Sequence, residues 1–342
     1  MYTIKKHFSP FAIKKQWLEF EKHGINIYQS YFVQQKVYTR LPFYAFRKKY
    51  RAEYYEIIKD GKTVMIVPLC RYKGTNKFII VGSVNGFQSF DFIYDSNAKQ
   101  DEIDEHIAFL LEHLDYESII VRNFRLTSLV YRSLCKFDLI SDEDLMENVS
   151  INIGNDYESY FSSLSKHTRQ NVRTAYNRVK KEGISLNYSV FINQKIPQKL
   201  LNELIELYCD RHEKHYGVKS SKFKRFYLKH FDFSTACLRQ YKNFCAVLKL
   251  NSEIVAFLSG LINEQNKSII VPRLSICDEY SRYSPGVILI NETAKRIAEA
   301  KDLQILDLSK GKEQYKVSMG GEIYYQVNLV IKRIVKEKYG KA

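Results

Sequence analysis

The feature that most constrains the fold of this chain is an internal repeat. Residues Glu56–Gly82 align without gaps onto Ala246–Pro272, a shift of 190 positions. Each copy has the pattern of a strand, a tight turn, a second strand, a polar turn and a third strand. Asp60-Gly61 and Asn251-Ser252 lie at or near the first turn, where such residues accept unusual backbone angles. Six aligned pairs are identical: Lys59/Lys249, Asn76/Asn266, Lys77/Lys267, Ile79/Ile269, Ile80/Ile270 and Val81/Val271.

The segments after the two copies also correspond, each reading as a helix followed by a short strand. These segments are Asp101–Leu114 with Glu117–Asn123, and Val287–Ala300 with Gln304–Ser309. We therefore expect an α/β fold of the α+β type, with a mixed sheet in each of two domains, 1–145 and 146–342. The halves join in the acidic, helix-poor passage Asp138–Asn148.

The composition narrows the class of protein. The chain has 342 residues, a net charge of +15 and six cysteines, and no apolar run approaches the ~18 residues that span a bilayer. No C-x-x-C pair and no signal-peptide core are present, so we expect a cytoplasmic protein without zinc or disulfides. The positive charge attracts nucleic acid, anionic lipid or small phosphorylated substrates, or it reflects a general compositional bias.

The last third of the chain has the pattern of an anion site. Tyr283-Ser284-Pro285-Gly286 forms a turn that opens a helix, where unpaired N–H groups and the helix dipole favour negative charge. The next strand ends at Asp307 and is followed by Glu313, Tyr315 and Lys316. An acid, a base and a cation are thus predicted close to a phosphate-binding turn, which indicates an enzyme that handles a phosphorylated carrier. The first repeat continues instead as Ser83-Val84-Asn85-Gly86-Phe87, so we expect it to form a scaffold or substrate wall.

Two helices carry further candidates. Ser165–Glu182 presents Lys166, Arg169, Arg173 and Lys180 away from its apolar stripe, either to grip phosphates or as a solvated face. Pro197–Tyr216 ends with His212 and His215, three residues apart. No third metal ligand follows at a suitable spacing, so these histidines contact substrate, act as a weak base or simply end an exposed helix.

From Ser165 onward, these motifs together resemble the GNAT acyltransferase superfamily. The closest likeness is to the branch with polysaccharide-biosynthesis acyltransferases and Fem-type peptidyltransferases. It is carried by the basic helix, by the strand Ser268–Cys277 leading to the Pro-Gly turn, and by the pattern Asp307-x-x-x-Gly311-x-Glu313-x-Tyr315-Lys316. The resemblance covers roughly 148–333, and the first half is assigned through the internal repeat.

The resemblance implies two tandem GNAT-like domains, the first degenerate, and a binding site for acyl-CoA in the second. The pantetheine arm would lie between splayed strands beside Leu274, Ser275 and Ile276. The pyrophosphate would lie on the turn Ser284, Pro285, Gly286 and Val287. The superfamily's usual loop is Gln/Arg-x-x-Gly-x-Gly/Ala, whereas this chain has Arg282-Tyr-Ser-Pro-Gly with a single glycine.

The resemblance also implies direct attack of an amine on the thioester. Asp307 or Glu313 would take the amine proton, Tyr315 would protonate the thiolate, and Lys316 would hold a phosphate or the oxyanion. Alternatively, Asp307 and Glu313 cap the helix Lys312–Ser318 and pair with Lys316. A covalent route through Cys277 is disfavoured because no histidine partner is evident.

These expectations lead to three functional hypotheses. The first is an N-acyltransferase that moves an acyl group from CoA to a nucleotide-linked amino sugar for surface polysaccharide, with Arg169, Arg173, His212 and His215 contacting the acceptor. The second is a Fem-type ligase that transfers an amino acid from tRNA to a cell-wall precursor. The third is a nucleic-acid-binding protein, although no recognised binding module is present. We expect a monomer, because tandem domains mimic a dimer.

Overall fold

The computed structural model describes residues 1–44, 49–83, 88–217, 222, 225–226, 228 and 242–333. Of the segment 83–87, which distinguishes the first repeat from the second in the sequence, only Ser83 lies within these described residues. The chain forms two compact units, one made of Met1–Met146 with Tyr325–Ala342 and the other of Glu147–Tyr324. We call them unit 1 and unit 2.

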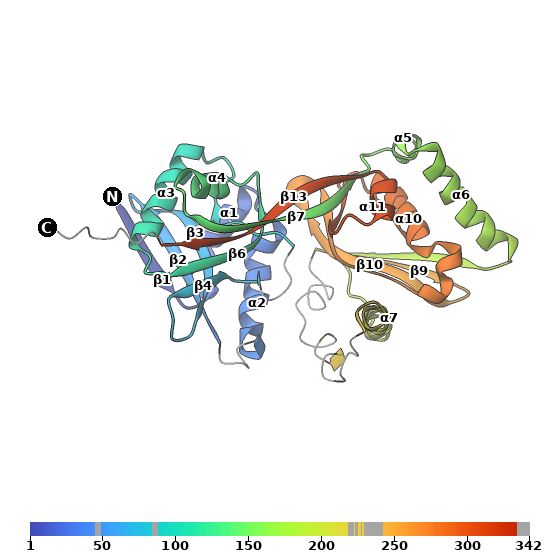
Figure 1. The fold of residues 1–342 in the computed structure, drawn as a ribbon, viewed down its shortest axis with the longest axis horizontal. Helices are drawn as coiled ribbons and strands as arrows, with labels where there is room; N and C mark the ends of the chain where they lie inside the picture. The colour runs from blue at the N-terminus through green and yellow to red at the C-terminus, as the bar shows by residue number, and fades with distance from the viewer. Residues whose placement is uncertain are drawn as a thin grey trace. The chain divides into compact units, whose positions relative to one another are not determined.

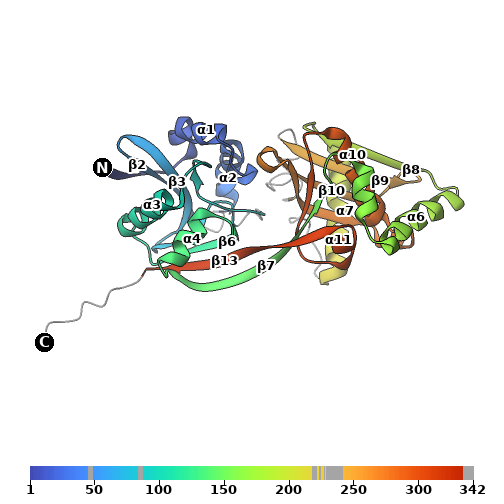
Figure 2. The ribbon, with the colours of Figure 1, turned by 90° about the horizontal axis from the view of Figure 1, so that it is seen from above.

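Unit 1 is a mixed sheet with helices on both faces. Its strands follow the order β1-β2-β3-β4-β6-β13, with β5 paired to β3, and only the pair β4–β6 is parallel. Figure 2 shows α1 and α2 on one face of this sheet and α3 and α4 on the other. The elements before β13 are β1 (Tyr2–His7), η1 (Pro10–Ile13), α1 (Lys14–Lys22), η2 (Ile27–Gln29), α2 (Tyr31–Tyr44), β2 (Tyr50–Lys59), β3 (Lys62–Tyr72), β4 (Lys77–Ile80), β5 (Ile93–Tyr94), α3 (Gln100–His113), β6 (Ser118–Arg125) and α4 (Leu129–Lys136).

Unit 2 repeats this plan with the strand order β7-β12-β11-β10-β9-β8, in which only β11–β12 is parallel. Helix α6 is the basic helix predicted from the sequence, and α7 is the helix that carries the two histidines. The elements are β7 (Ile140–Asn152), α5 (Tyr157–Ser163), α6 (Lys166–Lys181), β8 (Leu186–Ile192), α7 (Gln198–Tyr216), β9 (Asn243–Leu250), β10 (Glu253–Asn263), η5 (Glu264–Asn266), β11 (Ser268–Ile276), η6 (Asp278–Tyr283), α10 (Pro285–Ala300), β12 (Ile305–Lys310), α11 (Gln314–Ser318) and β13 (Gly321–Lys332).

The sheet of unit 2 is buried on both faces, as alternation along β9 shows. Phe244, Ala246 and Leu248 pack in the cluster that contains α6 and α10, whereas Cys245 and Val247 pack in the cluster that contains α7. Successive side chains of a strand point to opposite faces, so α7 covers one face and α6 with α10 covers the other (Figure 1). This explains why β9 reads as an almost continuous apolar run.

The order of elements in the two repeats agrees with the sequence expectation, but the alignment of the repeats is off by one residue. Lys59 pairs with Lys62 across the first turn and Leu250 pairs with Glu253 across the second. Corresponding positions therefore differ by 191, not 190. Because a shift of one residue exchanges the faces of a strand, the six identical pairs are not structurally equivalent.

The turns themselves explain the new register. Asp60 and Gly61 have φ of 50° and 79°, and Asn251 and Ser252 have φ of 48° and 71°. Two consecutive left-handed residues are the mark of the two-residue hairpin turn that matches strand twist. The paired turns therefore occupy the same place in both units.

In each unit, one strand at the edge of the repeat comes from the segment that follows the other repeat. β13 follows the second repeat but pairs with β6 of unit 1, and β7 follows the first repeat but pairs with β12 of unit 2. The chain enters unit 2 within β7 and returns to unit 1 within β13. The segment from Tyr325 onward, expected in the second domain, is therefore grouped with unit 1 because its hydrogen bonds go to β6.

We predict that Gly260→Ala strongly destabilises unit 2. A Cβ at this position in β10 would lie 2.2 Å from the carbonyl oxygen of Ile270 in β11, so the strands must separate. We expect a loss of at least about 2 kcal/mol in the free energy of unfolding, measured by urea denaturation. Gly286→Ala is the matched control, since its Cβ would meet only Ile276 Cγ2 at 3.4 Å. Equal stability of the two variants would contradict the prediction.

Candidate functional site

Strands β11 and β12 pair only at their beginnings and then part. The parallel pairs are Ser268–Ile305, Ile269–Leu306 and Ile270–Asp307, and the register of β11 against β10 then shifts across Val271-Pro272. Proline cannot donate a ladder hydrogen bond and is tolerated in sheets at such bulges. Beyond it, the edge of 274–276 has no β12 partner within the described chain. This is the splayed geometry expected for Leu274, Ser275 and Ile276.

The predicted anion turn lies beside the end of this strand. Ser284 adopts a left-handed conformation, with φ of 52°, and Pro285 begins α10. No side chain caps this helix and its first turn has no acidic residue, so its dipole favours an anion. A Cβ on Gly286 would touch Ile276, which brings the turn against the strand end. Val287 donates its backbone N–H to Ser284 O at 3.0 Å.

A cavity of about 560 Å³ gathers several of the predicted residues. Four of its lining residues come from the last turns of α7, one from β11, one from the residue before α11 and one from α11 itself. Histidines, a carboxylate, a phenol and the strand that is expected to hold the donor therefore share one space. The lining residues are Tyr208, Arg211, His212, His215, Leu274, Glu313 and Tyr315.

Tyr315 is held in its neutral form. Burial, together with the Glu313 carboxylate, raises the pKa of its phenol to about 12, and Arg211 opposes this shift. The ring is only partly exposed and faces the cavity. At neutral pH, Tyr315 is therefore a hydrogen-bond donor toward anything bound there.

Asp307 has a different environment from Glu313 and does not line the cavity. Its carboxylate is 8% exposed. It accepts hydrogen bonds from Tyr324 Oη at 2.8 and 3.0 Å and from the backbone N–H of Ser309 at 2.8 Å. Of the two carboxylates predicted for proton transfer, Glu313 is the one exposed to the cavity. Neither carboxylate accepts a side-chain cap bond at the start of α11.

Lys316 is buried and directed toward the protein. Its Nζ donates to three backbone carbonyls and lies 2.8 Å from Glu313 Oε2. Lys316 and Glu313 therefore form the ion pair that was one of the alternatives expected from the sequence.

Arg169 and Arg173 lie on α6 and do not line this cavity. Arg169 donates to the carbonyls of Ser162 and Leu164, both at 2.6 Å. The guanidinium of Arg173 lies 5.8 Å from the ring of Phe161. Both arginines therefore contact the chain just before α6.

Two cavity residues were not selected from the sequence. Tyr208 and Arg211 lie on α7, and Arg211 donates to Ile276 O at 3.4 Å. Arg211 is adjacent to the predicted His212 and lies one helical turn after Tyr208, so helical spacing from the histidines could have found both. Tyr324, which holds Asp307, had no comparable signal because it approaches from β13.

In unit 1 the corresponding gap between parallel strands is filled by the chain itself. Phe90 forms a parallel bridge with Phe124 of β6 and donates its N–H to Asn123 O at 3.0 Å. Phe90 and Phe92 are 3% and 2% exposed. β6, the equivalent of β12, therefore has a chain partner at this point, beyond its pairing with β4.

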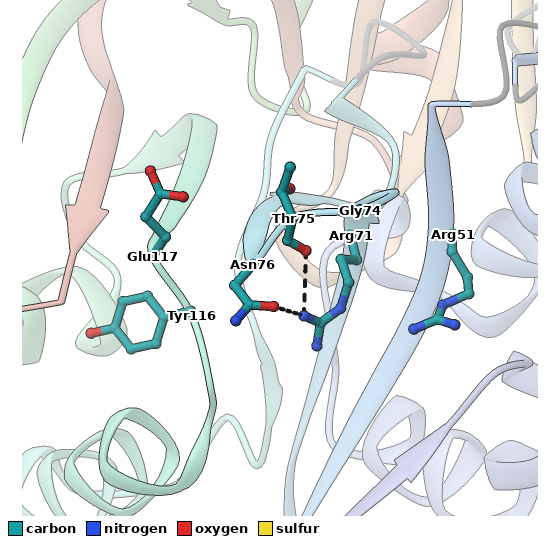
Figure 3. A pocket seen from close by; sticks show the side chains of 7 residues that line it. All are labelled: Arg51, Arg71, Gly74, Thr75, Asn76, Tyr116 and Glu117. Atoms are coloured by element: carbon teal, nitrogen blue, oxygen red, sulfur yellow. Dashed lines mark hydrogen bonds between the residues drawn. The ribbon is translucent and has the colours of Figure 1, made fainter.

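Another cavity, of about 540 Å³, lies in unit 1 (Figure 3). Arg51 and Arg71 lie directly opposite on β2 and β3, where like charges repel. Both donate to the buried carboxylate of Glu53; burial would raise its pKa, but these hydrogen bonds and one from Tyr55 lower it below its usual value. Arg71 also donates to Thr75 O and Asn76 Oδ1 in the turn that follows β3, so this network fastens the turn. The lining residues are Arg51, Arg71, Gly74, Thr75, Asn76, Tyr116 and Glu117.

Within the described chain, no three His, Cys, Asp or Glu side chains lie close enough together to hold a metal ion. Among the described helices, none has the length and apolar character needed to cross a membrane.

Comparisons with known proteins agree with this geometry. Residues 166–317 match the family described as "Acetyltransferase (GNAT) domain". A comparison with curated protein sequences finds no match. The splayed strands, the uncapped helix start and the family match define an acyl-transfer enzyme. Residues 166–317, within unit 2, therefore form a GNAT acetyltransferase domain, and unit 1 repeats its plan of strands.

Solved structures of similar fold extend over the whole chain. FemX is 10% identical, with 95% of this chain and 96% of that chain covered and a TM-score of 0.59. L-PGS from Bacillus licheniformis is 13% identical, with 94% and 91% covered and a TM-score of 0.54. An acetyltransferase from the GNAT family from Colwellia psychrerythraea is 8% identical, with 96% and 100% covered and a TM-score of 0.51. At these identities the likeness concerns the fold alone.

We predict that Tyr315 titrates near pH 12 in the folded protein. An unfolded tyrosine titrates near 10, so this group contributes stability below about pH 10 that is lost as the pH rises through 12. The measurement is a tyrosine ring ¹³C NMR titration, with Tyr315→Phe to assign the signal and exposed Tyr325→Phe as the control. A Tyr315 signal that shifts near pH 10 would contradict the assignment.

Proposed function

We propose that this chain is an N-acyltransferase that moves an acyl group from acyl-CoA to the amino group of a nucleotide-linked amino sugar, in the synthesis of a surface polysaccharide. The observation that supports it most is the cavity in which Glu313 and Tyr315 face the free edge of β11 at Leu274. A thioester bound along that edge would lie next to a proton acceptor and a hydrogen-bond donor.

Acyl-CoA would be held in two places. The edge at Leu274, Ser275 and Ile276 offers backbone groups to the pantetheine arm, whose amides need such partners. The turn at 284–287 offers the Gly286 N–H and the dipole of α10 to the pyrophosphate, since Pro285 has no N–H and those of Ser284 and Val287 already donate to backbone carbonyls. Unit 1 would act as a scaffold and acceptor wall without a donor, since its own chain fills the corresponding gap.

The proposed chemistry is an acyl transfer in which one proton moves from the amine to the departing thiol. The amine nitrogen attacks the thioester carbonyl carbon, Glu313 accepts the amine proton, and the C–S bond breaks. The proton on Glu313 then completes the thiol. Tyr315 hydrogen-bonds the departing sulfur and keeps its own proton, because its pKa of about 12 lies well above that of an ordinary thiol.

The acceptor would enter beside α7, where His212, His215 and Arg211 line the same cavity. A cation and two imidazoles suit hydroxyl, phosphate and amine groups of a nucleotide sugar. Arg169 and Arg173 remain candidates for the acceptor's outer phosphates only if Arg169 exchanges its backbone carbonyl partners and Arg173 leaves the ring of Phe161.

The fold similarity to FemX over nearly the whole chain favours a second candidate, a Fem-type transfer of an amino acid from charged tRNA to a cell-wall precursor. The net charge of +15 would suit tRNA. Consumption of labelled aminoacyl-tRNA with no release of thiol from acyl-CoA would favour this function over the first.

We predict that the chain binds one CoA, at unit 2, with a dissociation constant in the micromolar range. Gly286→Trp should abolish binding because the indole would occupy the space beside Ile276. Isothermal calorimetry gives both stoichiometry and affinity. Two CoA per chain would contradict the filled gap of unit 1, and absence of CoA heat would contradict the proposed donor.

We also predict that Glu313→Gln lowers turnover about 10²–10⁴-fold, the usual contribution of a general base. Tyr315→Phe should lower it less, and Asp307→Asn least, because Asp307 faces Tyr324 rather than the cavity. Thiol release from acyl-CoAs against a panel of nucleotide amino sugars measures this. Full turnover by Glu313→Gln would remove its assignment as the base.

A further inference from the structure

One buried cation organises the segment between β12 and α11. The ammonium of Lys316, whose side chain is 6% exposed, has four oxygen neighbours and three N–H donors. These neighbours are the carbonyls of Leu308, Lys310 and Gly311 at 3.2, 2.7 and 3.2 Å and Glu313 Oε2 at 2.8 Å. A buried ammonium with this many acceptors has no donor left for a substrate.

The backbone around it is shaped to bring those oxygens together. Ser309 and Gly311 have φ of 54° and 95°, and the register of β12 against β7 shifts between Asp307 and Lys310. A Cβ on Gly311 would lie 2.8 Å from a Glu313 carboxylate oxygen. The carboxylate therefore folds over Gly311, a position where a side chain cannot fit without moving it.

Glu313 itself would otherwise be free to move. Its side chain is 54% exposed, and an exposed glutamate samples several rotamers. Among the interactions described for Glu313, its contacts with Lys316 and Gly311 are the ones that keep the carboxylate at the wall of the cavity. A general base must be held within hydrogen-bond reach of the proton that it accepts.

We propose that Lys316 is a positioning residue, which acts on the reaction through Glu313 and does not contact substrate. This rests on the proposed function, in which Glu313 is the base. It differs from the sequence expectation that Lys316 holds a phosphate or an oxyanion, because the ammonium is buried and its donors point to the backbone. The carbonyl contacts fix the ammonium, and the ammonium fixes the carboxylate.

The test is a double-mutant cycle with Lys316→Met, Glu313→Gln and the double variant, with kcat and donor affinity measured for each. We expect Lys316→Met to lower kcat about 10–100-fold with CoA affinity unchanged. The double variant should be no slower than Glu313→Gln alone, because the two residues act as one unit. Lys316→Arg, which keeps the charge, should recover part of the loss.

Gly311→Ala provides a second variant, which keeps Lys316 but strains the backbone at φ of 95°, so its folding is measured as well. Its Cβ displaces the carboxylate, so kcat should fall in the same way as in Lys316→Met. Lys22→Met is the matched control, since Lys22 also pairs with a glutamate three residues away but on the surface of unit 1. Circular dichroism and thermal unfolding identify any variant that fails to fold. If Lys316→Met does not fold, the kcat values of Lys316→Arg and Gly311→Ala test the positioning role in its place.

The outcomes separate the two proposals. Additive losses in the double variant, or a loss of CoA affinity in Lys316→Met, would overturn the positioning role while leaving the acyltransferase proposal intact. Unchanged turnover in Glu313→Gln would instead overturn the proposed base, and the positioning role with it.

Discussion

The site depends on the early end of hydrogen bonding between β11 and β12. Three residue pairs join these parallel strands, and the bulge at Val271-Pro272 then turns β11 away. An open strand edge inside a sheet leaves backbone groups without partners, which is costly unless something binds them. Gly260 makes the opening possible, because only a residue without a side chain permits β10 to approach β11 so closely.

The contrast between the units shows that the same fold does not ensure the same function. Unit 1 has equivalent strands and the same hairpin turn, yet Phe90 pairs with Phe124 of β6, the strand equivalent to β12. The cavity of unit 1 is lined by Arg51 and Arg71, which both donate to the buried carboxylate of Glu53. Function thus depends on local features of each copy and not on the shared architecture.

Much of the architecture could be predicted from the sequence, because periodicity and turn residues are local signals. The repeat, the helices 166–181 and 285–300 and the grouping of Glu313 with Tyr315 follow from such signals. The register of the repeat was predicted wrongly, because six identical residues favour a shift of 190 whereas the equivalent turns require a shift of 191. The partners of Asp307 and Lys316 depend on tertiary approach, from Tyr324 and from backbone carbonyls, and leave no local pattern.

The exchange of last strands has a consequence for synthesis on the ribosome. The edge of β6 is completed by β13, which is made about 200 residues later. At typical rates of ~5–20 residues per second, the first half emerges with an exposed strand edge for tens of seconds. During that time it can pair with a neighbouring nascent chain. Translation speed and chaperone capacity should therefore govern how much of this protein reaches its native state.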